Sequence, residues 1–339
     1  MYRFDNFFRD TAFSAAMADY PILAIDVGAR GGFEADLLPV AFAVDAVGFE
    51  PEPAAFAHLS GVGPWKSLRY APIALSGSGG WRRLNVTRDP TGATLLEPNQ
   101  KFGSELDKQQ FFEVVRTIEL KTETLDDAVS QLGISRVDYL KIDIEGAELE
   151  VLVGGAKTLE GLLALKTEVM FAPVRHQQPF AADMDSMLRA KGFRLMEIIR
   201  PAVWRRHGYI VHPQFGREAI PYSKGQLIHG DYLFFREPEK IESPHQALRM
   251  SFVALAYGFF DFAECLLARP DVHGLLKDQY GLRLGEEMKR ASSRFGRRIW
   301  LQELVSHLRG IAPFIRSFAR MMASRFEKDS CAVDEARRR

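Results

Sequence analysis

Charged residues interrupt an apolar segment in the middle of the chain, where they could carry out chemistry. Residues 137–153 read VDYLKIDIEGAELEVLV, and apolar residues first alternate with Lys141, Asp143 and Glu145. That period of two predicts a strand, and the helical spacing of the apolar residues after Gly146 predicts a helix. The strand is therefore charged at its carboxyl end, the end at which open α/β sheets bind ligands. A purely structural reading stays open, in which Lys141 neutralises Asp143 and Glu145 offsets the helix dipole.

A glycine turn and an acidic strand end form a second candidate site. Residues 22–32, ILAIDVGARGG, predict a buried strand that runs into a glycine turn, and a helix through Leu38 should follow. The next predicted strand, residues 43–50, ends in Glu50. An acid at this place can accept hydrogen bonds from both hydroxyls of a ribose. This order of elements suits two cofactors, a dinucleotide or S-adenosylmethionine.

The charges around the turn distinguish these two cofactors. The glycine spacing does not match the G-x-G-x-x-G pattern of dinucleotide-binding turns. Asp26 lies two residues before Gly28, and its carboxylate would repel a pyrophosphate held at the start of the helix. The same carboxylate would attract the ammonium group of a methionine moiety, and S-adenosylmethionine carries a sulfonium charge and no phosphate. The residues therefore favour S-adenosylmethionine.

The segment KIDIEGAELEVL, residues 141–152, resembles the signature of the FkbM-type methyltransferases, a family that uses S-adenosylmethionine. Residues 25–32, IDVGARGG, are similar to the family's first motif, although Arg30 stands where a small polar residue is commoner. Residues 49–53, FEPEP, are similar to its ribose motif, and residues 74–76, ALS, resemble the family less specifically.

This resemblance covers most of residues 22–236 and implies O-methylation of a hydroxyl on a sugar, a glycolipid or a polyketide-type acceptor. It implies that Asp26, Gly28 and Glu50 hold the cofactor. The cofactor-binding residues expected from the motifs together are Asp26, Gly28, Ala29, Arg30, Gly31, Glu50, Pro51, Ala74, Leu75 and Asp143. Two other classes stay open. One is a nicotinamide-dependent oxidoreductase, for which no Tyr/Lys or His catalytic signature stands out, and the other is a non-catalytic binding protein that keeps the fold.

Methyl transfer to an alcohol needs a base that contacts the hydroxyl, because an alcohol is a poor acid. Asp143 and then Glu145 are the first candidates, since they lie nearest in sequence to the expected place of the methyl group, and His176 follows. Weaker candidates, as lone loop histidines, are His207, His212 and His229. A divalent metal held by Asp143 with Glu145 or Glu168 would suit the preference of magnesium for oxygen. The spacing does not require it, so no metal ligand is assigned.

The whole pattern predicts a doubly wound α/β sheet of the Rossmann-like methyltransferase type, mostly parallel with an antiparallel last strand. We expect an N-terminal helix over residues 1–20, a cofactor-binding domain over residues 21–238 and a helical extension over residues 239–339. Further strands are expected at residues 68–75, 81–87, 114–120, 165–171, 193–199 and 232–235, the second and third of them as a hairpin.

Composition limits the partners and the cellular location expected for the protein. The chain has 339 residues and a formal net charge of zero, which gives no argument for a nucleic-acid partner. Its two cysteines, Cys265 and Cys331, cannot form a disulfide framework or a zinc site, so a reducing cytoplasm is the simplest location. Charges break any signal-peptide core near the N-terminus, and the longest apolar run, residues 252–268, is too short to cross a bilayer. No membrane span is expected.

The C-terminal extension, residues 239–339, differs from the rest of the chain in its predicted structure and charge. Helices are expected over residues 244–268, 282–294 and 298–326, with a kink at Pro313 in the last one. An apolar stripe runs from Trp300 to Phe326, and residues 281–339 contain 14 Lys and Arg against 7 Asp and Glu. So long a stripe must be covered. Intramolecular packing on the helix that begins at Pro244 is the first expectation, a homodimer the second, and peripheral contact with an anionic membrane the third.

Overall fold

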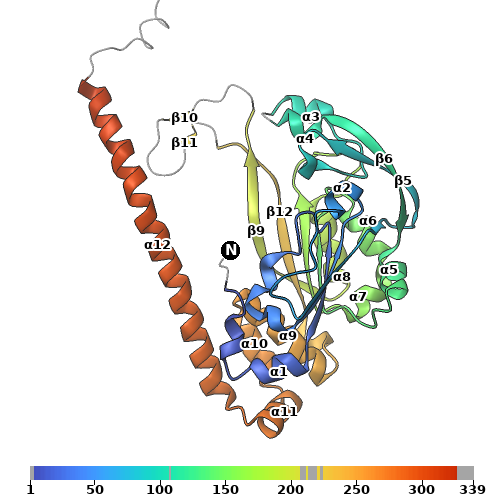
Figure 1. The fold of residues 1–339 in the computed structure, drawn as a ribbon, viewed down its shortest axis with the longest axis vertical. Coiled ribbons are helices and arrows are strands. Elements are labelled where there is room, and N and C mark those ends of the chain that lie inside the picture. Colours follow the sequence, from blue (N-terminus) through green and yellow to red (C-terminus); the bar gives the residue numbers. More distant parts are fainter. Residues whose placement is uncertain (1–3, 107, 207–210, 213–219, 222–223, 327–339) are drawn as a thin grey trace, which may run out of the picture.

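The computed structural model describes residues 4–326 except 107, 207–210, 213–219 and 222–223. Its centre is a seven-stranded sheet in the order β3-β2-β1-β7-β8-β12-β9 (Figure 1). The strands are β1 (Ile22–Val27), β2 (Val44–Phe49), β3 (Ser67–Ala71), β7 (Tyr139–Ile142), β8 (Ala164–Met170), β9 (Phe193–Trp204) and β12 (Gln226–Arg236). All neighbouring pairs are parallel except those of β12, which runs antiparallel to both β8 and β9. The predicted sheet, with its antiparallel last strand, is confirmed.

The alternation of apolar residues along the strands divides the core into two layers. Ala24 in β1 and Ala46 in β2 face a cluster that contains Phe8 and Leu248. Their neighbour Ile25 faces the opposite cluster. Successive strand residues point to opposite faces, so every central strand must be covered on both sides, as in a doubly wound sheet.

One face is covered by helices from the middle of the chain. They are α5 (Leu125–Gln131), α6 (Glu148–Val153), α7 (Ala156–Gly161) and α8 (Ala181–Ala190). The other face is covered by segments from the two ends of the sequence, which share one core. They are η1 (Phe7–Asp10), α1 (Ser14–Asp19), η2 (Ala35–Ala43), α9 (Pro244–Tyr257), α10 (Phe260–Leu267) and α11 (Pro270–Tyr280). The N-terminal helix and the C-terminal extension therefore help to bury the sheet, and their boundaries as separate domains stay a prediction.

A small second sheet lies beside the main one. It has the order β4-β6-β5 and consists of β4 (Ala74–Leu75), β5 (Gly80–Thr87) and β6 (Val114–Glu123), of which β5 and β6 form the predicted hairpin. The single strand expected over residues 68–75 is wrong, because β3 belongs to the main sheet and β4 to the second. Short helices α3 (Gln100–Ser104) and α4 (Gln109–Phe112) and the turn η3 (Pro90–Gly92) connect the hairpin.

Local backbone conformation corrects several expected helices. The segment after the glycine turn, where a helix through Leu38 was expected, is the 3-10 element η2, and a short helix, α2 (Pro53–Phe56), follows Glu50. The helix expected over residues 244–268 is two helices, because Gly258 takes a left-handed conformation (φ +89°) that ends α9. The helix α11 was missed. Strands β9 and β12 extend further than predicted, towards the short pair β10 (Val211–His212) and β11 (Ile220–Pro221), while His207, Tyr222 and Cys331 lie outside the described residues.

The last helix differs most from expectation. Residues expected to form two helices with a kink make one, α12 (Leu284–Phe326), which continues through Pro313. Its first turns pack on the core through Met288 and Phe295. Beyond them it extends away from the body of the protein (Figure 1), and Trp300 is 63 % exposed. The expectation that the stripe packs on the helix from Pro244 is therefore wrong, because α12 has left the core before the stripe begins. Among the described residues, no helix is long and apolar enough to cross a membrane.

Candidate functional site

A pocket opens at the carboxyl ends of β1, β2 and β7. Its floor includes Asp26 within β1, Gly28 directly after it, Glu50 after β2 and Asp143 after β7. The second sheet and the loop that precedes α3 contribute its other wall, through Leu75, Leu84, Pro90, Ala93, Leu95 and Leu120. The cavity measures about 300 Å³, and it joins polar groups on one side to apolar side chains on the other, as small-molecule sites do.

Gly28 has a reason for being glycine that the sequence did not reveal. Its φ is +86°, and a Cβ atom there would lie 2.0 Å from the carbonyl oxygen of Asp143. The turn after β1 and the segment after β7 are therefore in direct backbone contact. Any side chain at this position would push apart the two segments that carry Asp26 and Asp143.

Asp26 and Lys141 form a buried ion pair beneath the pocket. The Asp26 side chain is 1 % exposed, and its Oδ1 lies 3.1 Å from Lys141 Nζ, while Oδ2 accepts a hydrogen bond from Glu34 N. Lys141 Nζ also lies 3.5 Å from Asp143 Oδ2. Burial raises the pKa of Asp26, and the Lys141 ammonium opposes that shift. The sequence analysis paired Lys141 with Asp143, whereas its nearer partner is Asp26.

Glu50 follows β2, the strand that pairs with β1 on the side away from β7. It is 4 % exposed, and its Oε1 accepts a hydrogen bond from Glu52 N at 2.9 Å. Burial raises the pKa of Glu50. Arg30 lines the pocket, but its guanidinium is paired with Glu52 at 2.6 Å, and Arg116 is also bonded to Glu52. Glu52 is a buried anchor that the sequence analysis did not identify, although it lies within the FEPEP motif.

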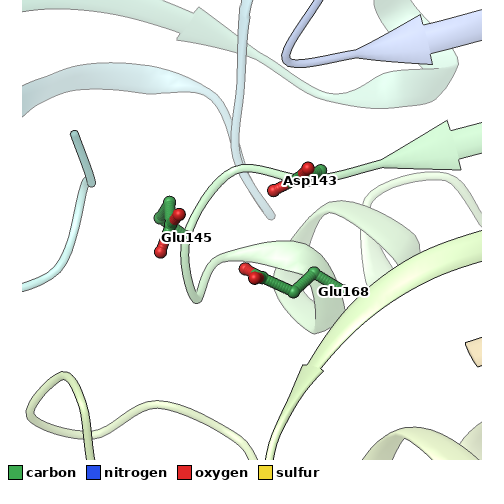
Figure 2. Close-up of side chains that lie close together, drawn as sticks. All are labelled: Asp143, Glu145 and Glu168. Carbon is green, nitrogen blue, oxygen red and sulfur yellow. The ribbon is translucent and has the colours of Figure 1, made fainter. Parts of the chain in front are cut away.

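Three carboxylates meet at the edge of the pocket. Asp143 and Glu145 follow β7, Glu168 comes from β8, and one oxygen of each lies within 4.8 Å of the others. Figure 2 shows the three side chains directed toward one another. We call Asp143, Glu145 and Glu168 the acidic cluster. Glu145 has φ +60°, a left-handed conformation that a non-glycine residue adopts only when its surroundings enforce it.

Neighbouring groups hold the acidic cluster in place. Arg175, which is fully buried, lies 3.2 Å from Glu145 Oε2, and its guanidinium stacks over Phe111 at 4.8 Å. The hydroxyl of Thr94 donates a hydrogen bond to the Glu145 carbonyl. His229 Nδ1 lies 2.9 Å from Glu168 Oε1. Burial is the largest cause that raises the pKa values of Glu145 and Glu168 well above their usual range, and the neighbouring carboxylates raise both further.

The predicted bases are thus only partly brought together. Asp143 and Glu145 line the pocket, whereas His176 is exposed and does not line it. Its neighbour Arg175 points inward instead, and the sequence offered no period or motif that could have distinguished these two residues. His229, one of the weaker candidates, is the histidine that the structure places in contact with the acidic cluster.

Of the ten expected cofactor-binding residues, most line this pocket. Those are Asp26, Gly28, Arg30, Glu50, Pro51, Ala74, Leu75 and Asp143. Ala29 and Gly31 belong to the same turn but do not line the pocket. Glu148, another residue that the sequence analysis missed, lies below the acidic cluster, where its carboxylate accepts hydrogen bonds from Ile144 N and Gly146 N. It caps this turn in the way that Glu145 was expected to do.

Comparison with known proteins agrees with this geometry. Residues 26–195 match a family model described as the methyltransferase FkbM domain. The chain is 28 % identical over 149 residues to the 2-O-methyltransferase NoeI of Sinorhizobium fredii, a match that covers 42 % of this chain and 61 % of that protein. The chain therefore spans only about three fifths of the length of this curated relative.

Two solved structures resemble the chain more loosely. One, from Pyrococcus horikoshii, is provisionally described as an RNA methyltransferase, with 12 % identity over 66 % of this chain and 78 % of that one, at a TM-score of 0.28. The other is a domain from Corynebacterium diphtheriae provisionally described as a precorrin-6Y C5,15-methyltransferase, with 12 % identity over 66 % of this chain and 93 % of that one, at a TM-score of 0.26. Overlaps this loose add nothing to the assignment of function.

Proposed function

Because the chain belongs to the methyltransferase FkbM family, we propose that it transfers the methyl group of S-adenosylmethionine to a hydroxyl oxygen of a sugar, glycolipid or polyketide-type acceptor. The observation that supports this proposal most is the joining of Asp26, Glu50 and Asp143 in one pocket. The similarity to a protein described as a 2-O-methyltransferase supports oxygen as the atom methylated.

The charges of the pocket suit S-adenosylmethionine better than a dinucleotide. Glu50 would accept hydrogen bonds from the ribose hydroxyls, and Asp26 would face the ammonium group. The two cations of the lining cannot easily bind a pyrophosphate, because Arg30 is paired with Glu52 and Lys141 with Asp26. The apolar wall, with Leu75 among its residues, offers a surface for the adenine ring.

The reaction requires little covalent chemistry from the protein. When bound, S-adenosylmethionine supplies a methyl carbon that its sulfonium already activates. The acceptor oxygen forms a bond to that carbon while the carbon–sulfur bond breaks, which yields a methyl ether and S-adenosylhomocysteine, and the hydroxyl proton passes to a carboxylate. The protein must position the acceptor oxygen in line and hold the proton acceptor against it.

Asp143 is the residue we assign as that proton acceptor. It lines the pocket, and its side chain is 41 % exposed, against 13 % for Glu145 and 7 % for Glu168. Glu145 is paired with Arg175 and Glu168 with His229, so Asp143 is the member of the acidic cluster that an entering hydroxyl reaches most directly.

Two measurements test this function. Isothermal titration with S-adenosylhomocysteine and with NAD separates the methyltransferase from an oxidoreductase, and binding of NAD alone would contradict the proposal. Transfer of labelled methyl from S-adenosylmethionine to a panel of glycans, glycolipids and polyketides then identifies the acceptor. Tight binding of S-adenosylhomocysteine without transfer to any acceptor would point instead to a binding protein that keeps the fold.

A further inference from the structure

The acidic cluster contains more carboxyl groups than the nearby cations can pair. Glu168 is 6 % exposed, and its Oε2 is fully buried without a hydrogen-bond partner among the described residues. This oxygen belongs to a side chain directed at Asp143 and Glu145 (Figure 2). A buried carboxylate oxygen without a partner is unfavourable, so a further group is expected to contact it.

The nearby cations are already engaged. Arg175 is paired with Glu145, and Lys141 is shared between Asp26 and Asp143. In the described part of the chain, two permanent positive charges thus serve four carboxylates, those of Asp26 and the acidic cluster.

We propose that Asp143, Glu145 and Glu168 bind a divalent cation, Mg²⁺ or Mn²⁺. Carboxylate oxygens are the ligands these ions prefer, and three such donors from the protein leave coordination positions for water and for an acceptor hydroxyl. One oxygen of each carboxylate lies within 4.8 Å of the others. Small side-chain movements would bring all three into the coordination shell of a single ion. The cation also gives a reason for the left-handed backbone of Glu145 (φ +60°), whose carboxylate lies near those of Asp143 and Glu168.

The proposal that a cation binds here does not depend on any reaction, whereas the catalytic role of the cation rests on the proposed function. A hydroxyl bound to the cation would lose its proton more readily, and the proton would pass to Asp143 or to solvent. His229, whose Nδ1 is 2.9 Å from Glu168 Oε1, would act as a positioning residue that keeps one carboxylate oxygen aimed at the ion.

The experiment uses the full chain after treatment with EDTA. Titration of Mn²⁺ and Mg²⁺ by calorimetry, together with thermal unfolding, should show one bound ion and a rise in Tm. Glu168→Gln should weaken Mn²⁺ binding at least tenfold, whereas Glu160→Gln, which removes an exposed carboxylate outside the cluster, should leave it unchanged. If Glu168→Gln does not fold, Asp143→Asn serves instead, because that side chain is partly exposed.

The proposed cation site would be contradicted if neither Mn²⁺ nor Mg²⁺ bound. Equal Mn²⁺ affinity in Glu168→Gln and the parent protein would contradict it as well. Binding of S-adenosylhomocysteine to the same samples separates this result from the proposed function. Mn²⁺ binding without S-adenosylhomocysteine binding would keep the metal site and contradict the methyltransferase. The reverse result would keep the methyltransferase and contradict the metal site.

A second, independent observation concerns the distal part of α12. Its exposed apolar residues are Trp300, Leu301, Leu304, Val305, Leu308, Ile311, Ile315 and Phe318, which we call the exposed stripe. Six of them, from Leu301 to Phe318, follow alternating steps of three and four residues, which places them on one face of the helix. Such spacing suits either a coiled coil with a second copy or the surface of a membrane.

Charge decides between these occupants. Residues 297–326 contain six arginines and a single acidic residue, Glu303, so this part of the helix has a net charge of +5. Two such helices would repel each other, whereas an anionic bilayer would attract them. Trp300 and Val305 also widen the exposed stripe beyond the narrow seam of a two-stranded coiled coil. An exposed arginine such as Arg309 is long enough to reach lipid phosphates while the apolar face enters the interface.

We infer that distal α12 binds the surface of an anionic membrane. Flotation of the full chain with phosphatidylglycerol vesicles should recover most of the protein, and vesicles of phosphatidylcholine or high salt should reduce the bound fraction severalfold. Leu304→Glu with Leu308→Glu should abolish flotation. Val62→Glu, which alters an 86 % exposed apolar residue elsewhere, should not. A monodisperse dimer that ignores anionic vesicles would overturn the inference and favour the coiled coil.

Discussion

In two regions of the molecule, side chains lie in surroundings that are energetically unfavourable for them. The pocket and the acidic cluster bury charged groups, whereas distal α12 exposes apolar ones. The pocket compensates with ion pairs and backbone hydrogen bonds, and only part of its charge remains unbalanced. The exposed stripe has no such compensation within the described residues. The first arrangement is typical of a site for a small ligand, and the second of a surface that a larger partner covers.

The largest expected effect tests whether the buried charges are balanced as described. Lys141→Met should lower the free energy of unfolding by about 3–5 kcal/mol, because it leaves Asp26 buried without its partner. Denaturation by urea measures this loss. Lys121→Met, which removes an exposed lysine from β6, is the control and should change stability little. Addition of Asp26→Asn to Lys141→Met should restore part of the lost stability.

A second prediction concerns turnover. Asp143→Asn should reduce methyl transfer at least about a hundredfold, as expected for a lost base or metal ligand, and should keep S-adenosylhomocysteine affinity within about tenfold. Asp278→Asn, an exposed acid of α11, should leave the rate unchanged. Unimpaired turnover in Asp143→Asn together with its loss in His176→Ala would move the base to a residue that the structure places outside the pocket.

Glu50→Ala should weaken S-adenosylmethionine binding by about 1–3 kcal/mol, the range for loss of hydrogen bonds to a charged group. Calorimetry measures the affinity, and a melting curve shows whether the fold survives. Normal affinity in a folded variant would remove Glu50 from the cofactor site and leave Asp26 as the pocket's main acidic contact.

Burial of carboxylates should also make stability depend on pH. Burial raises the pKa of Glu148 to about 7, against an ordinary value of 4.5. Between these two values the folded protein binds more protons than the unfolded chain, so the contribution of Glu148 to stability is lost as the pH rises from about 4.5 to 7. Glu148→Gln should therefore gain stability relative to the parent protein over this interval, by up to about 3 kcal/mol. Urea denaturation in EDTA at pH 5 and pH 8 measures the difference, and a constant difference would refute the prediction.

The two regions also differ in how far the sequence could predict them. The doubly wound, mostly parallel sheet followed from strand–turn–helix patterns. Asp26, Glu50 and Asp143 were expected together because the carboxyl ends of parallel strands meet at one edge. The partners of these residues were not predictable. Arg175, Thr94 and His229 reach the acidic cluster from distant parts of the chain, and no local period marks such contacts.

For distal α12, the sequence showed the pattern of the residues but not what covers them. Its apolar period was plain in the sequence, and so was its positive charge. What covers an amphipathic face is a tertiary property, and the pattern would have been the same had the helix folded back on α9. The N-terminal phenylalanines, Phe7 and Phe8, show this as well, because they pack against Phe295 and so complete the core before the exposed stripe begins.

The last prediction tests whether the exposed stripe contributes to the stability of the folded protein. Truncation after Ile299 removes the exposed stripe but keeps Met288, Phe295 and the part of α12 that packs on the core. The free energy of unfolding should change by no more than about 0.5 kcal/mol, because the removed side chains contribute little buried area. S-adenosylhomocysteine affinity should also be unchanged, since the pocket lies at the sheet.

Truncation after Pro238 is the contrasting variant. It removes α9 and uncovers Phe8 and its neighbours, so it should aggregate. A loss of more than about 1 kcal/mol after truncation at Ile299 would mean that protein covers the exposed stripe in solution. The conclusion that the core is stable without the exposed stripe would then be wrong.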